Sequence, residues 1–105
     1  NHKKRWILGK RPKGIIYVDE GANSAIRNNK SLLASGIINF EGEFDYGDTV
    51  KVYNTSKSEI ARGLINYSSK QLGLIMGKKS QEIERILGEE NSYSCVIHID
   101  NMILF

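Results

Sequence analysis

The chain has 105 residues, of which 40% are hydrophobic and 26% are charged. This composition is typical of one folded domain and excludes a disordered tail. No apolar run approaches the roughly 20 residues that a membrane span needs, so we expect no membrane partner. The single cysteine excludes an internal disulfide and fits a reducing compartment.

The charge is divided unevenly along the chain. Residues 1–13, here called the basic leader, carry six Lys or Arg side chains and no acid, whereas the other 92 residues carry a net charge of −3. The leader includes Lys3, Lys4 and Arg5, which are candidate contacts to a nucleic acid or another anion. Trp6 either stacks on a base or packs the leader against a neighbouring domain, and we favour the second interpretation. Since the first residue is not Met, we also expect a longer parent protein.

The body of the chain begins with a strand, a helix and a second strand. Residues 14–19 are β-branched and aromatic, which predicts a strand, and residues 19–29 change to a helical period. From residue 36 onward apolar residues alternate, with Ile38 and Phe40 on the face that we expect to be buried. The later predicted elements are strands at 49–53 and 59–67, helices at 69–76 and 81–87, and strands at 95–100 and 102–105.

This order of elements predicts the fold class. Short strands dominate, no βαβ unit repeats, and residues 36–67 look like an antiparallel meander. We therefore predict an α+β, mainly β fold: a small barrel of short, mostly antiparallel strands with short flanking helices. A doubly wound nucleotide fold is not indicated.

The pair Gly21-Ala22 at the predicted helix start has two interpretations. Its backbone amides could bind a phosphate, but Asp19 and Glu20 at the same helix end would repel an anion. Neither GxGxxG nor GxxxxGK[ST] is present. We favour packing, because two small residues let a helix cross close to a strand.

Other candidate chemistry is weaker still. Cys95 and His98 have a C-x-x-H spacing, but a zinc site needs about four ligands and strand alternation explains both residues. Asp45 and Asp48 flank a turn, where Asp commonly bonds the backbone. We predict no metal site, no cofactor site and no catalytic residue in this sequence.

Three basic residues of the body could form a small anion-binding face. They are Arg27 and Lys30, on and just after the predicted helix, and Arg62, within an apolar strand. The alternative, which we favour, is a solvated helix face and an edge-strand charge.

Taken together, these motifs resemble the PUA domain, in the version found at the C-terminus of bacterial glutamate 5-kinases. The resemblance covers nearly the whole chain and rests on motifs that are specific only in combination. They are KRWI at 4–7, YVDxGA at 17–22, KSLLxxGI at 30–37, EGxFxxGD at 41–48, IARGL at 60–64, NYS at 66–68, SxEIxxILG at 80–88 and IHxDN at 97–101.

The resemblance implies a PUA-like pseudo-barrel in residues 14–105, with residues 1–13 as a basic linker from a kinase domain. In this family that kinase domain phosphorylates glutamate with ATP and Mg²⁺, in the cytoplasm, for proline biosynthesis. We expect a non-catalytic regulatory or interaction module, whose partners are the kinase domain of the same chain and further copies in a homo-oligomer. The alternative is a weak RNA-binding module, since PUA domains elsewhere bind RNA.

The resemblance also favours packing at the junction between helix and strand. Its residues are Gly21, Ala22, Leu32, Leu33 and Gly36. If Leu33 is fully buried, Leu33→Ala should cost about 2–4 kcal/mol.

Overall fold

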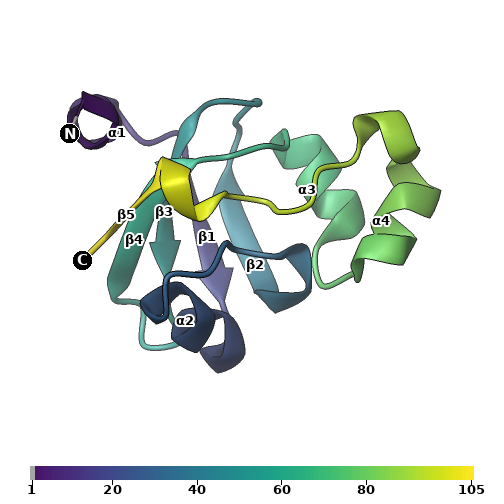
Figure 1. Ribbon diagram of the computed structural model, residues 1–105, viewed down its shortest axis with the longest axis horizontal. Helices are drawn as coiled ribbons and strands as arrows, with labels where there is room; N and C mark the ends of the chain where they lie inside the picture. Colours follow the sequence, from purple (N-terminus) through teal and green to yellow (C-terminus); the bar gives the residue numbers. More distant parts are fainter. Residues whose placement is uncertain (1) are drawn as a thin grey trace.

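The computed structural model describes residues 2–105, which form one five-stranded sheet with helices around it (Figure 1). The strands are β1 (Gly14–Val18), β2 (Ile37–Gly42), β3 (Thr49–Tyr53), β4 (Glu59–Leu64) and β5 (Met102–Leu104). The helices are α1 (His2–Gly9), α2 (Glu20–Arg27), α3 (Ser69–Ile75) and α4 (Ser80–Leu87), with short 3-10 turns η1 (Ala34–Gly36), η2 (Glu89–Asn91) and η3 (Ile99–Asn101). None of the helices in residues 2–105 is long and apolar enough to cross a membrane.

The strands lie in the order β2-β1-β3-β4-β5, and three of the four neighbouring pairs are antiparallel. The predicted α+β fold with mostly antiparallel strands is therefore confirmed. The predicted meander is wrong at one pair, because β2 joins β1 and β3 runs parallel to β1 on its other side. Residues 43–48 thus cross from one side of β1 to the other, which leaves β1 in the middle of three strands.

The hydrophobic core lies between the sheet and the helices. Ile16 and Val18 of β1 are fully buried, as is Ile26 of α2. Leu72 and Ile75 bury the inner face of α3 against the same cluster. The core therefore joins the first strand, the first body helix and the later helices into one unit.

Local signals place two helix starts as predicted. The carboxylate of Asp19 accepts a hydrogen bond from the backbone N–H of Ala22 at 2.7 Å and caps α2. Ser68 and Gln71 form a reciprocal capping box at the start of α3, which satisfies two helix N–H groups that otherwise lack partners.

Two expectations about the strands are wrong. Residues 95–100 do not form a strand that pairs with the last one: Ile97 makes an isolated bridge to Leu32, and β5 pairs with β4 instead. In β2, Ile37 is buried whereas Ile38 is 53% exposed. The pairing register of β1 and β2 is irregular at this end of β2, and a shift of one residue reverses which side chain faces the core.

Most of the basic leader is helical. Residues 2–9 form α1, a helix that we did not predict from the sequence, and Ile7 is fully buried where α1 contacts β4 and β5. Trp6 is 60% exposed, and the Lys10 ammonium lies 4.3 Å from the centre of its ring. Both termini lie at the same end of the molecule, opposite α4 (Figure 1).

Candidate functional site

The start of α2 is occupied by the protein's own carboxylate. The Asp19 side chain accepts from the Ala22 N–H, which is one of the amides that a phosphate would need. Gly36 lies against Ala22 so closely that a Cβ atom on Gly36 would fall 2.5 Å from the Ala22 Cβ. Gly21, in contrast, is exposed. This geometry allows α2 to pack closely on the η1 turn. It is a poor binding site for an anion, because Asp19 already accepts from the helix N-terminus.

The adjacent leucines of the junction have different environments. Leu32 is 1% exposed, and its backbone N–H donates to the carbonyl of Ile97 at 2.9 Å. Leu33 is 49% exposed and stands between two hollows of the surface. The condition on which Leu33→Ala would be costly, full burial of Leu33, is therefore not met, since the bridge to Ile97 turns Leu32 inward and Leu33 outward.

Of the three body residues proposed as an anion-binding face, Arg27 and Arg62 already have partners. Arg62 donates two hydrogen bonds to the Glu59 carboxylate, at 2.9 and 3.1 Å, and its guanidinium lies 5.7 Å from the Phe105 ring centre. Arg27 donates to the backbone carbonyl of Phe105. Because β4 lies between β3 and β5, the expectation of an edge-strand charge at Arg62 is also wrong.

Lys30 is exposed, as Arg27 is, but it lies in a different part of the surface. It lines a hollow of about 290 Å³ beside the start of α2, together with Asp19 and Ser31. The nearby Asp19 carboxylate reduces the attraction of this hollow for an anion. The structure thus brings Arg27 and Arg62 together at Phe105, with Lys30 in a different setting.

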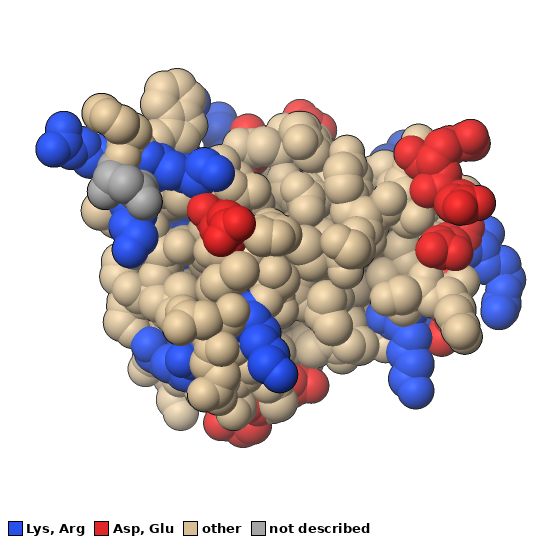
Figure 2. All heavy atoms as spheres, viewed as in Figure 1, with Lys and Arg blue, Asp and Glu red and all other residues tan. Residues whose placement is uncertain are grey.

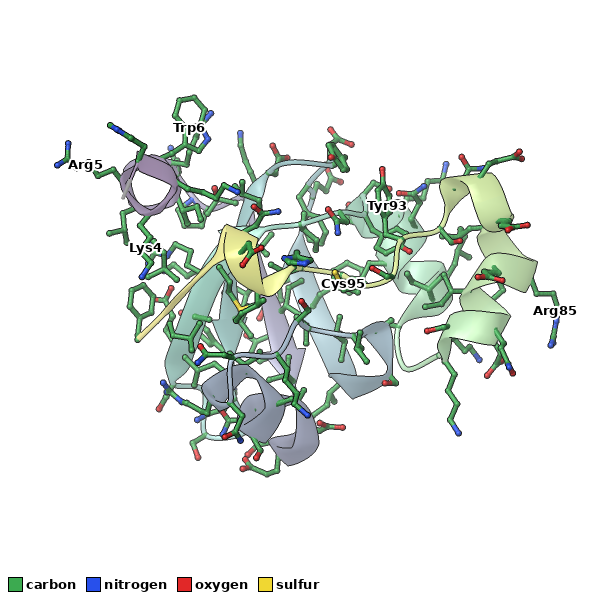
Figure 3. The ribbon with its side chains drawn as sticks, in the orientation of Figure 1. Lys4, Arg5, Trp6, Arg85, Tyr93 and Cys95 are labelled. Atoms are coloured by element: carbon green, nitrogen blue, oxygen red, sulfur yellow. The ribbon has the colours of Figure 1, made fainter. Side chains whose placement is uncertain are left out.

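The leader cations gather at one end of the molecule. Figure 2 shows Lys and Arg side chains over α1, whereas Asp and Glu side chains gather at the opposite end, over α4 and η2. Figure 3 shows Arg5 pointing away from the sheet and Lys4 pointing back toward it. Lys3 and Lys4 line a third hollow of about 460 Å³ between α1 and β5.

Cys95 and His98, which share the C-x-x-H spacing, lie in different surroundings. Cys95 is buried next to Asn66, whose amide donates to the Cys95 carbonyl at 3.1 Å. His98 is exposed, and its Nδ1 accepts from the backbone N–H of Asp100 at 3.0 Å. Within residues 2–105, no group of three or more His, Cys, Asp or Glu side chains is arranged to hold a metal ion.

A tyrosine cluster that the sequence did not reveal lies at the α4 end. Tyr46 and Tyr93 stack with ring centres 5.7 Å apart, and both rings are exposed. The buried Tyr67 packs edge-on against Tyr93, and its hydroxyl accepts from the Tyr93 N–H. Burial raises the pKa of Tyr67 above 10.0. No local pattern could reveal this cluster, because its members are far apart in the sequence.

Comparison with known proteins places this geometry in a family. The model of the PUA domain matches residues 14–87. Glutamate 5-kinases of Bartonella henselae and Dictyoglomus turgidum are each 47% identical to the chain, over 105 and 106 residues. Each match covers 99% of this chain, but only 27% and 28% of the respective relative. The chain therefore spans little more than a quarter of the length of these curated relatives and matches their C-terminal part.

A solved structure supports the fold independently. The crystal structure of a PUA domain protein from Aeropyrum pernix, in complex with tartrate, superposes with a TM-score of 0.63 at 22% identity. The superposition covers 82% of this chain and 41% of that one. With a family model that spans residues 14–87 and a shared architecture, the chain belongs to the PUA domain family.

Proposed function

We propose that the chain is the C-terminal, non-catalytic PUA domain of a glutamate 5-kinase. The observation that carries the proposal is 47% identity to such enzymes across 99% of the chain. The parent enzyme would transfer the γ-phosphoryl group of ATP to the side-chain carboxylate of glutamate in the cytoplasm, for proline biosynthesis. Its kinase domain would hold ATP, Mg²⁺ and glutamate, and residues 1–13 would join that domain to the PUA domain in residues 14–105.

A non-catalytic role is consistent with the described side chains. The α2 start is capped by Asp19, and Arg62 is paired with Glu59. These groups stabilise the fold and leave little for substrate chemistry. The domain would act through contacts with the kinase domain and between the subunits of a homo-oligomer.

The test compares the full-length enzyme with its parts. We expect glutamate-dependent ATP turnover from the full-length chain, and neither turnover nor MgATP binding from the 105-residue chain. Calorimetric titration of the 105-residue chain with MgATP measures the second point directly. A saturable isotherm would contradict the proposal, and so would a full-length chain that does not phosphorylate glutamate.

RNA binding is a second candidate, supported by the six basic residues of the leader. A leader that contacts three or four phosphates should give a slope of roughly −2 to −3 in log K against log salt. Because Ile7 of the leader is buried, replacing Lys3, Lys4 and Arg5 by Ala tests this better than deletion of residues 1–13.

The matched control for RNA binding lies in the body. Arg27→Ala with Lys30→Ala should change the affinity little, because Arg27 is engaged by Phe105 and Lys30 lies near Asp19. RNA titrations at two salt concentrations measure both variants. If the body variant abolishes binding and the leader variant does not, RNA recognition by residues 14–105 becomes the better-supported function of the domain.

A further inference from the structure

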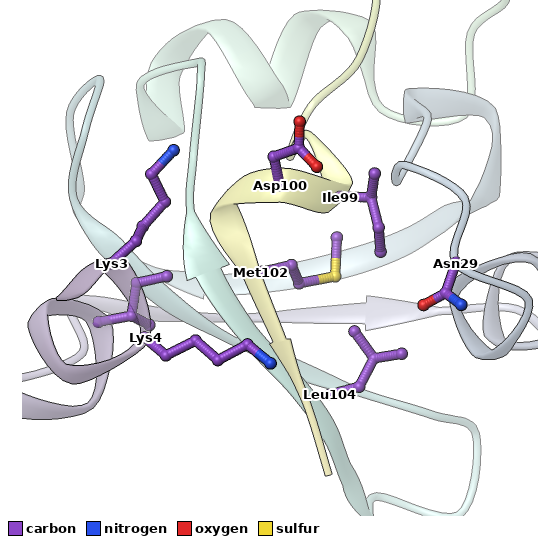
Figure 4. Close-up of a pocket in the computed structure, with 8 residues that line it drawn as sticks. Lys3, Lys4, Asn29, Ile99, Asp100, Met102 and Leu104 are labelled. Carbon is purple, nitrogen blue, oxygen red and sulfur yellow. The ribbon is translucent and has the colours of Figure 1, made fainter. Parts of the chain in front are cut away.

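The hollow between α1 and β5, here called the α1–β5 pocket, has an apolar floor. Ile7 of α1 and Met102 of β5 are buried at its base, and Ile99 and Leu104 line its sides. Its volume is about 460 Å³, which is within the range of pockets that bind small ligands or single side chains. Figure 4 shows that its lining residues come from α1, β5, the η3 turn and the chain just after α2.

The rim of the pocket is cationic on one side. Lys3 and Lys4 of α1 line it, and Asp100 of η3 is the one acid among the described lining residues. Figure 4 shows the Lys4 side chain extending across the pocket toward Leu104. An occupant that complements this lining carries an apolar group for the floor and a negative charge near the two lysines.

The position of α1 makes the pocket sensitive to what fills it. Ile7 is the one buried residue of this eight-residue helix, and helices this short are marginal in water without tertiary contacts. A group that fills the pocket would touch both α1 and β5, because residues of both elements line it. Occupancy would therefore hold α1 against the sheet.

We propose that the α1–β5 pocket receives a short acidic segment with one apolar anchor side chain, from the polypeptide ahead of α1 in a full-length glutamate 5-kinase. This inference rests on the proposed function. Lys3 and Lys4 lie in the first turn of α1, so they are the pocket residues closest in sequence to a preceding segment. A short tether gives an effective concentration on the order of 1 mM. At that concentration, even for a segment with a Kd of about 0.1 mM, the ratio of the docked to the undocked state is about ten.

The test is amide hydrogen exchange on the full-length chain and on the 105-residue chain. In the full-length chain, amides of residues 2–9 and 99–104 should exchange about tenfold more slowly, because the docked segment must leave before they open. Lys3→Glu with Lys4→Glu should remove this difference, since it reverses the charge that faces the acidic segment. Ile99→Ser should reduce the difference by weakening the apolar contact.

A matched control separates docking from general charge effects. Lys78→Glu with Lys79→Glu makes the same charge change beside α4, away from the α1–β5 pocket, and should leave the exchange difference intact. Thermal melting of each 105-residue variant shows that the fold is retained. Equal exchange of residues 2–9 and 99–104 in both chain lengths would overturn the inference, as would the loss of the difference in the control variant.

One further measurement distinguishes the two proposals. If the full-length chain phosphorylates glutamate but shows no extra protection of the pocket, the proposed function stands and the docking inference fails. If it does not phosphorylate glutamate, the proposed function itself fails. Protection that RNA or MgATP produces in the 105-residue chain, without the preceding segment, would also overturn the inference by assigning the pocket to another occupant.

Discussion

Leu32→Ala should destabilise the domain far more than Leu33→Ala, although the two residues are chemically identical and adjacent. Leu32 is 1% exposed and belongs to the main core cluster. Its truncation should lower the free energy of unfolding by about 3–5 kcal/mol, through lost burial and the cavity that remains. Leu33 is 49% exposed, so its truncation should cost less than about 1 kcal/mol.

Urea titration followed by circular dichroism measures both variants under the same conditions. For a domain of this size, 1 kcal/mol shifts the thermal midpoint by roughly 4–8 °C. Leu32→Ala should therefore melt at least about 12 °C lower, while Leu33→Ala stays within about 8 °C of the parent chain. Equal losses in the two variants, or a larger loss for Leu33→Ala, would show that the burial at this junction has been assigned to the wrong residue.

Other substitutions test the leader helix, an ion pair and a half-buried tyrosine of β1. Ile7→Ala removes the buried contact of α1 and should lower the unfolding free energy by about 2–4 kcal/mol in urea; an unchanged midpoint would mean that α1 is not docked in solution. In a double-mutant cycle, Arg62→Ala and Glu59→Ala should couple by no more than about 1 kcal/mol, and less at high salt, because the pair is partly exposed. The hydrogen bond from Tyr17 to the Glu41 carboxylate raises the pKa of Tyr17 above 10.0. The folded state thus keeps this proton longer, so its stabilisation is present below pH 10.0 and is lost as pH rises through the folded pKa. Alkaline titration of tyrosine absorbance, compared with Tyr17→Phe, should show that raised pKa; a normal value would refute the contact.

The sequence by itself determined the elements whose causes are local. The Asp19 cap of α2 and the capping box of Ser68 and Gln71 each join residues only three positions apart. Residues 14–18 likewise form a strand from their own β-branched and aromatic character. These local signals predicted a small α+β fold, whereas the PUA-like version of that fold was predicted from the resemblance of the sequence motifs to the family.

The tertiary structure decided which of two equivalent residues faces the core. Leu32 and Leu33 have the same hydrophobicity, and so do Ile37 and Ile38, so composition cannot choose between them. The choice was made by partners distant in sequence: the bridge from Leu32 to Ile97, and the irregular pairing of β2 with β1.

The same reason explains the candidate site. Whether a basic side chain can bind an anion depends on the groups that neighbour it in the folded structure. The hydrogen-bond partner of Arg27 is Phe105, which is 78 residues away in the sequence. The residues around Ile7 have no amphipathic pattern that would predict a helix with a buried face. Ile7 is nevertheless fully buried where α1 contacts β4 and β5. Pairing between distant segments is set by the free energy of the whole packed core, which no short window of sequence contains.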